Sequence, residues 1–209
     1  MSLPRGRHRF HGEIAGVGSS SGVRVVIGRW RESPLGTFAD VMLAEPDGTR
    51  VLLAPAEAVA DFVSTTYRFD RVEIGAVSLA IEEGGSGRPA WHVMAPGLDI
   101  TFRVGPRPAL GWLLRLVPSR LATAPWWARL TDPVARVVLR GVRTRGTAGN
   151  ARREYYGATD LHRITELTGS WQGNDVGGLA PVSPEPGFGF GSTPQRPSVT
   201  SIVTTIDLG

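Results

Sequence analysis

The sequence predicts one mainly β domain of the α+β class, built as a curved antiparallel sheet or β-barrel with helical insertions. Two observations indicate this fold. The first half and the end of the chain alternate apolar and polar residues with the period of two that a half-buried strand requires. Short runs rich in Gly, Pro and Asp separate these segments, as turns do. A chain of 209 residues is long enough to bury a substantial core, and we assign residues 1–209 to a single domain.

Four strands are expected at the start of the chain, over residues 8–14, 23–30, 37–44 and 49–54. In the first of them, Phe10 and Ile14 fall on one face, and His11 and Glu13 fall on the other. A Gly/Ser turn separates the first two strands. The last two meet across Asp47-Gly48, a dipeptide typical of a tight hairpin. The opening of the chain therefore predicts antiparallel β-structure.

The period then changes to that of a helix over residues 55–66, where apolar residues recur at helical spacing and a proline suits the first turn. Strand character resumes over 71–82. Two further strands over 90–94 and 98–104 would pair across a Pro-Gly turn. The second of these places Leu98, Ile100, Phe102 and Val104 on one face.

The second half is less regular. Residues 108–145 form an expected helical insertion rich in Arg and Trp and interrupted by prolines, with its best helix over 133–143. Strand patterns return over 154–164 and 199–206. Between them, residues 177–197 hold 5 Gly and 5 Pro, which favours a long irregular connection.

Two residue types are absent from the sequence. Without cysteine, the chain has no disulfide framework, no Cys-ligated zinc and no thiol nucleophile. All 23 basic residues are Arg, so lysine is absent as well. This excludes Schiff-base chemistry and a P-loop lysine.

The net charge of +4 is unevenly distributed: residues 1–102, 103–163 and 164–209 carry −2, +9 and −3. Within the basic stretch, Arg136, Arg140 and Arg143 form one helical stripe that could contact anions. Three tryptophans, Trp112, Trp126 and Trp127, accompany the arginines in this region. An amphipathic lid packed on the barrel and a helix docked on an anionic membrane or acidic partner both fit this composition. No nucleic-acid-binding module is present.

Targeting and metal signals are weak. The basic N-terminus is followed by no apolar stretch, so no secretory signal is expected, and the apolar run at 109–114 is far shorter than a membrane span. We therefore expect a cytoplasmic protein. The four histidines, His8, His11, His92 and His162, show no metal-ligand spacing. We expect no metal site and no cofactor.

The run Gly169-Ser170-Trp171 is similar to the Gly-x-Trp signature that opens lipocalin and nitrobindin-type barrels. In those families the signature begins the barrel, but here only 36 residues follow Gly173, too few to build one. We therefore interpret Trp171 as an aromatic residue of the core or rim.

The order of elements over residues 37–165 resembles that of the acetoacetate decarboxylase family of curved β-barrels. The segments that carry the resemblance are FADVML at 38–43, YRFDRVEI at 67–74, WHV at 91–93, DPVAR at 132–136 and YYGATDL at 155–161. The resemblance implies a barrel with a central pocket. It also implies a Schiff-base lysine near residues 69–71, and this chain has no lysine there or elsewhere.

A guanidinium offers no nucleophilic lone pair, so Arg71 cannot form the family's imine. If the pocket is retained, Arg71 becomes a candidate anion clamp, and Glu73 on the same strand face becomes a candidate acid–base partner. His92 is a further candidate for proton transfer and ligand contact. The resulting hypothesis is a barrel that binds a small, partly apolar, anionic metabolite, with Arg71, Glu73 and His92 at its site. The alternative is a non-enzymatic peripheral protein that docks through residues 108–145.

Overall fold

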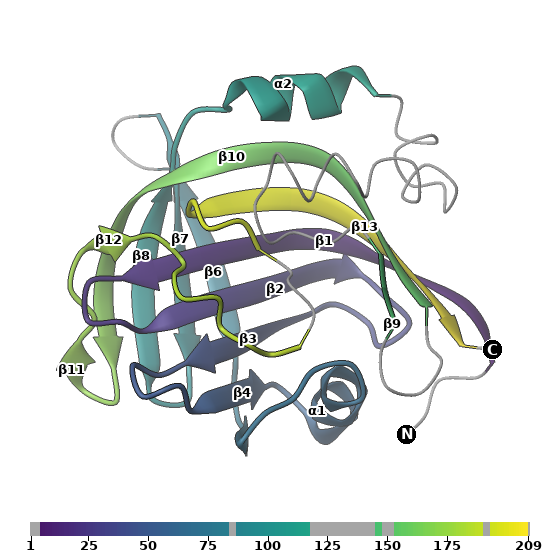
Figure 1. The fold of residues 1–209 in the computed structure, drawn as a ribbon, viewed down its shortest axis with the longest axis horizontal. Helices are drawn as coiled ribbons and strands as arrows, with labels where there is room; N and C mark the ends of the chain where they lie inside the picture. The colour runs from purple at the N-terminus through teal and green to yellow at the C-terminus, as the bar shows by residue number, and fades with distance from the viewer. Residues whose placement is uncertain (1–4, 84–86, 118–144, 148–152, 190–192, 209) are drawn as a thin grey trace.

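A computed structural model describes residues 5–83, 87–117, 145–147, 153–189 and 193–208. The described chain is mainly β, with a strongly curled open sheet and two helices (Figure 1). The main strands are β1 (Gly6–Ser19), β2 (Arg24–Glu32), β3 (Phe38–Ala44), β4 (Arg50–Ala54), β5 (Arg71–Ile74), β6 (Ser78–Glu83), β7 (Pro89–Ala95), β8 (Leu98–Val104), β10 (Arg153–Trp171) and β13 (Ser198–Leu208). The predicted fold class is confirmed.

The sheet has the order β5-β4-β3-β2-β1-β13-β10-β8-β7-β6, and all of these pairs are antiparallel except the parallel pair β4–β5. Three shorter strands join it at the side: β9 (Arg145–Thr147) and β11 (Asn174–Asp175) pair with β10, and β12 (Leu179–Ala180) pairs with β1. The helices are α1 (Glu57–Ser64) and α2 (Ala109–Leu116).

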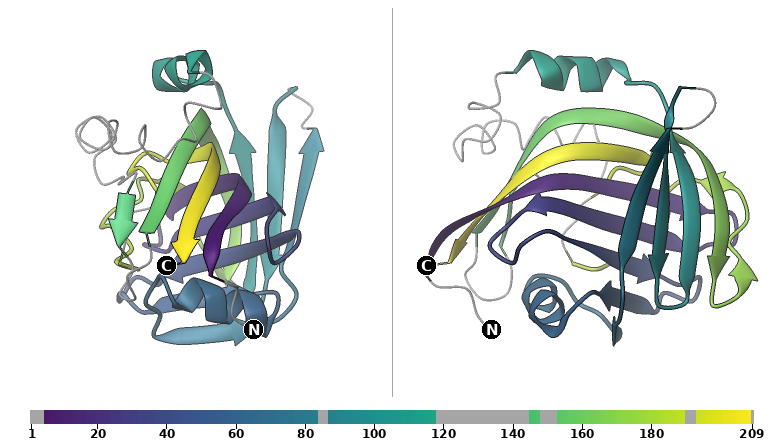
Figure 2. Two further views of the ribbon diagram at one scale, coloured as in Figure 1. Left: turned by 90° about the vertical axis from the view of Figure 1, so that its right-hand side faces the viewer. Right: turned by 180° about the vertical axis from the view of Figure 1, so that it is seen from behind.

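The longest strand, β10, joins the two halves of the sheet. Its first part pairs with β13 and its second part with β8, with register shifts between Ala158 and Asp160 and between Ile164 and Glu166. Such irregularities bend the strand that carries them. The sheet consequently turns at β10, so that β6–β8 stand across the long strands, as Figure 2 shows from behind.

The two edge strands of this sheet, β5 and β6, are neighbours in sequence. Only residues 75–77 join them, so the curl brings opposite edges of the sheet together at one end. The strand pattern predicted over 71–82 is therefore divided between two strands, β5 and β6. Gly75 marks the break, where a Cβ atom would lie 2.7 Å from a Pro96 side-chain carbon.

The two faces of β1–β4 pack against different partners. Alternate residues such as Ile27, Val41 and Leu53 lie on the barrel face, which packs against Trp91, Phe102 and their neighbours on β7 and β8. Trp171 is buried in this same core, as its sequence context predicted.

The opposite face of β1–β4, the helix face, is covered by α1. Met42 and Leu52 from the sheet pack there with Val59 and Val63 of the helix. Phe188, from the irregular connection, completes this layer. The predicted helix over 55–66 is thus found as α1, and the described part of residues 177–197 contains the short β12.

Helix α2 lies over β10 (Figure 1). Arg107, just before the helix, makes a bidentate ion pair with Asp160 of β10, with N–O distances of 2.7 and 2.8 Å. The Arg107 guanidinium also lies over the Trp112 ring, 4.6 Å from its centroid. The predicted helix over 133–143 lies outside the described residues. Within the described part of the chain, neither helix is long and apolar enough to cross a bilayer.

Candidate functional site

A cavity of about 50 Å³, partly open to solvent, lies between the helix face of the sheet and α1. It offers several times the space that one water molecule needs. Side chains from β1, β2, β3, β13, α1 and the segment after α1 line it. These are Phe10, Ile14, Val26, Gly28, Trp30, Phe38, Asp40, Met42, Phe62, Val63, Thr66, Tyr67, Thr204 and Ile206.

The lining divides into an apolar floor and an aromatic rim. The floor is buried and includes Phe10, Val26 and Met42. Half-buried aromatic residues surround the opening: Trp30, Phe38, Phe62 and Tyr67. Phe10 stacks on Phe62 with ring centroids 5.0 Å apart and meets Trp30 edge-on at 5.7 Å. The rings therefore support one another as a continuous wall.

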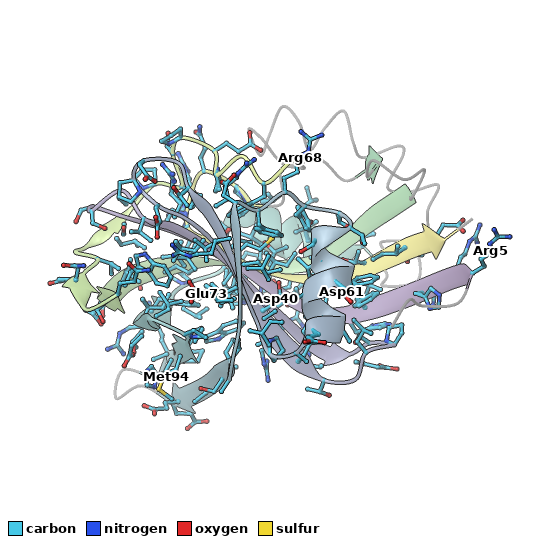
Figure 3. All side chains as sticks on the ribbon, turned by 90° about the horizontal axis from the view of Figure 1, so that it is seen from below. Arg5, Asp40, Asp61, Arg68, Glu73 and Met94 are labelled. Atoms are coloured by element: carbon cyan, nitrogen blue, oxygen red, sulfur yellow. The ribbon has the colours of Figure 1, made fainter. Side chains whose placement is uncertain are left out.

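Asp40 places a carboxyl group in this apolar setting. Its side chain is buried, and the Trp30 indole Nε1–H donates a 3.0 Å hydrogen bond to its Oδ1. Burial raises the pKa of Asp40 to about 7, although the Trp30 hydrogen bond favours the ionised form. The carboxyl group consequently changes its charge near neutral pH. Figure 3 shows Asp40 beside α1, with Glu73 farther from the helix.

Gly28 makes room for this carboxyl. It lies directly opposite Asp40 in the β2–β3 register, so both positions share the helix face. A Cβ atom at position 28 would lie 2.4 Å from Asp40 Oδ1 and 2.6 Å from Trp30 Nε1. A residue without a side chain is therefore needed where the carboxyl and the indole meet.

Thr204 of β13 supplies the other polar group of the floor. Its Oγ1 is buried and has no hydrogen-bond partner among the described residues. Buried hydroxyls in native structures nearly always have a partner, and those without one call for a water or a ligand. On the described lining, Asp40 is the only acid and no side chain is basic.

The structure brings Arg71 and Glu73 together, but on the barrel face of the sheet. Arg71 Nε lies 2.8 Å from Glu73 Oε1, and Arg71 Nη2 lies 3.2 Å from Glu45 Oε1. The Trp171 indole donates to the same Glu45 oxygen at 3.0 Å. One guanidinium thus faces two carboxylates. This geometry argues against the predicted anion clamp, because an incoming anion would meet a net negative cluster.

His92 lies apart from this pair. It alternates with the buried Trp91 and Val93 along β7, so its side chain is on the outer side of the curl. Its Nε2 lies 2.8 Å from Oδ1 of Asp99 on β8. The three residues Arg71, Glu73 and His92 do not form one site, and none of them lines the cavity.

The remaining predicted contacts fall elsewhere. Arg136, Arg140 and Arg143, the expected anionic-surface contacts, lie outside the described residues, as do Trp126 and Trp127. Among the described residues, no group of three or more His, Asp or Glu side chains is placed to hold a metal ion.

Sequence reasoning missed the cavity residues, although one signal was present. Asp40 interrupts an otherwise apolar strand, FADVMLA, in which both faces are buried. An acid in such a strand is either paired or located at a site. The alternation of Phe38, Asp40 and Met42 on one face could have identified Asp40. Its neighbours Thr204 and Phe62 come from distant elements and gave no local signal.

The fold and cavity together define a mainly β protein with a helix-covered pocket on one face of a curled sheet. No protein-family model matches the sequence, and no curated protein matches it. Among solved structures, the chain is similar to a Nitrosomonas europaea protein provisionally designated AttH, with 13% identity and a TM-score of 0.31. The similarity covers 99% of this chain and 55% of that one, so this chain spans about half of its neighbour. A match this weak supports no transfer of activity, and the resemblance to the acetoacetate decarboxylase family stays a prediction.

Proposed function

We propose that this protein binds a small, mostly apolar molecule in the cavity between α1 and the sheet. The observation that carries the proposal is a buried carboxyl, Asp40, at an otherwise apolar and aromatic cavity. Ligand sites are typically apolar concavities with a few well-placed polar groups. Asp40 would fix the orientation of a polar group of the ligand, and Thr204, three strands away in the sheet order, gives the lining a second buried polar group.

This proposal keeps the small, partly apolar ligand that the sequence predicted. It places the ligand in the cavity beside α1 instead of at Arg71, Glu73 and His92, and it no longer requires the ligand to be an anion. At the cavity, an anionic ligand would meet the Asp40 carboxyl with no basic side chain on the described lining to offset it. Arg71 is also a poor binding partner for an anion, because Glu45 and Glu73 already pair with its guanidinium.

Nuclear magnetic resonance tests the proposal through the Trp30 indole N–H, whose signal a Trp30→Phe variant identifies. The probe is 3,3-dimethylbutan-1-ol, a compact apolar group with one hydroxyl. We expect a saturable shift of the Trp30 indole signal in the wild-type protein. Val63→Trp, which places a larger side chain on the lining, should abolish it. Ser64→Trp is the matched control, because Ser64 is an exposed neighbour on the same helix.

Absence of a shift with this alcohol and with choline, a cation of the same shape, would remove the proposed function. An equal shift in the Val63→Trp variant would do the same, because the probe would then bind elsewhere.

The exposed surface of α2 favours a second candidate function, docking on an anionic membrane surface. Trp112, Leu113 and Leu116 are 59%, 59% and 80% exposed, beside the exposed Arg115. This pairing of aromatic, aliphatic and basic side chains is typical of interfacial helices. The surrounding stretch over 103–163 carries a net charge of +9, which complements anionic lipid.

Vesicle co-sedimentation tests this second candidate. We expect binding at low salt to vesicles containing phosphatidylserine, weaker binding to pure phosphatidylcholine, and loss of binding in a Leu113→Ser/Leu116→Ser variant. No binding to the anionic vesicles would eliminate membrane docking.

A further inference from the structure

We propose that the ligand of this cavity is an organic cation, such as an ammonium or quaternary ammonium group. The aromatic rim would surround the cation, and the Asp40 carboxylate would be its counter-ion. This inference rests on the proposed function, because it names the chemical class that the same cavity would take.

The first argument is the missing counter-ion of Asp40. Buried charges in proteins are normally paired or hydrogen-bonded, because an unpaired charge in an apolar setting is strongly destabilising. Asp40 receives one described side-chain hydrogen bond, from Trp30, and no described basic residue lines its cavity. Glu13 on β1, which is also buried, contrasts with it, because its carboxylate lies 3.3 Å from Arg29 and 3.0 Å from Arg31. A cationic ligand would supply the positive charge that the described lining does not.

The second argument is the composition of the wall. Five of the lining side chains are aromatic, namely Phe10, Trp30, Phe38, Phe62 and Tyr67. The faces of aromatic rings attract cations, and sites for quaternary ammonium groups are commonly built from several such rings around the cation. A purely apolar ligand would not need rings in preference to aliphatic side chains. The combination of several rings with one buried acid therefore favours a cation.

The third argument is the hydroxyl of Thr204. Its Oγ1 is buried on the floor of the cavity without a described partner, so it can accept a hydrogen bond from an ammonium or from a polar tail of the ligand. In the sheet order Thr204 on β13 lies three strands from Asp40 on β3, so the two groups would contact different parts of a ligand.

The inference also predicts how binding depends on pH. A cation binds the ionised carboxylate, and burial raises the pKa of Asp40 to about 7, so binding below that pH must displace a proton. Tyr67 is the other titratable group on the described lining. We expect the affinity for a cation to fall by about tenfold per pH unit below pH ~7 and to level off above it.

The experiment compares choline with 3,3-dimethylbutan-1-ol, which replaces the charged nitrogen by carbon and keeps the shape. Both are titrated into the full-length protein at pH 8, with the Trp30 indole signal as the readout. We expect choline to bind about tenfold more tightly or better. In Asp40→Asn this preference should disappear. Asp99→Asn, which changes an exposed carboxylate on β8, should retain it.

Each result decides between the two claims. If the alcohol binds and choline binds no better, the inference is overturned and the proposed function stands. If neither binds, both fail. A preference for choline that survives in Asp40→Asn also overturns the inference. Should that variant fail to fold, Phe38→Leu tests the aromatic rim independently, since Phe38 is only half-buried, and we expect a smaller preference for choline.

Discussion

At the scale of single residues, Asp40 links the stability of this protein to its candidate site. The carboxyl is buried, and its pKa is raised from 3.8 to about 7 in the folded protein. Folding therefore favours its protonated form. The contribution of protonated Asp40 to the free energy of unfolding is fully present below pH ~4 and is lost as the pH rises through about 7. The total loss is roughly 4 kcal/mol.

Asp40→Asn removes this dependence. Urea denaturation between pH 4 and 8 should show the variant gaining stability relative to the wild-type protein as the pH rises, with a plateau above pH ~7. The wild-type protein and the variant share every other carboxylate, so the pH dependence of those groups cancels in the difference between the two unfolding free energies. Asp70, whose pKa the Arg50 hydrogen bonds lower to about 2, titrates below this window. If the difference in unfolding free energy between the variant and the wild-type protein stays constant with pH, the claim that Asp40 is buried and protonated in the folded protein is contradicted.

Gly28 is the second residue on which the site depends. Gly28→Ala would drive a methyl group against Asp40 Oδ1 and Trp30 Nε1. We expect a loss of about 1–3 kcal/mol in the free energy of unfolding and a displaced Trp30 indole signal. Gly178→Ala is the matched control, because no atom lies within 4 Å of its Cβ position. Equal stabilities for the two variants would show that the carboxyl and indole can move apart without penalty.

At the scale of elements, the ion pair between Arg107 and Asp160 fixes α2 to β10. Burial is the largest single influence and raises the pKa of Asp160, but the hydrogen bonds from Arg107 and the Leu161 backbone N–H, together with neighbouring positive charge, outweigh it and leave the pKa below its ordinary value. Arg107 also lies over the Trp112 ring, so one side chain joins the strand, the loop and the helix.

Arg107→Ala should therefore release α2. We expect faster amide hydrogen exchange over residues 111–116 and a lower free energy of unfolding, since a partly buried carboxylate loses its bidentate partner. Arg103→Ala, which breaks the more exposed pair with Glu166, should leave exchange in α2 unchanged. Unaltered exchange in the Arg107 variant would mean that the remaining contacts of α2, which include the 4.0 Å pair between Arg115 and Asp160, retain the helix without Arg107.

At the scale of the whole molecule, local patterns predicted the strands and two of their hairpin pairings, but not the order of the whole sheet. The alternation of Leu98, Ile100 and Phe102 was sufficient to identify β8 and its buried face. The break near Gly75 was missed because the residues on both sides keep a strand pattern, while the reason for the break is the meeting of two sheet edges. Strand order is a long-range property that periodicity does not encode.

The candidate site was harder to predict for the same reason. Arg71 and Glu73 were correctly placed on one strand face, because alternation within a strand is local. The cavity instead combines Asp40, Phe62 and Thr204 from β3, α1 and β13, which are adjacent only after the sheet has curled and α1 has packed on it. Only the isolated acid in an apolar strand was visible in the sequence.

The most direct test of the central claim, that this cavity is a binding site, is a measurement of nuclear Overhauser contacts between bound 3,3-dimethylbutan-1-ol and the protein. The account predicts contacts from the probe's methyl groups to the side chains of Phe10, Met42 and Thr204, and their loss in Val63→Trp. Contacts to other surfaces only, or no contacts when the probe is in excess, would contradict it.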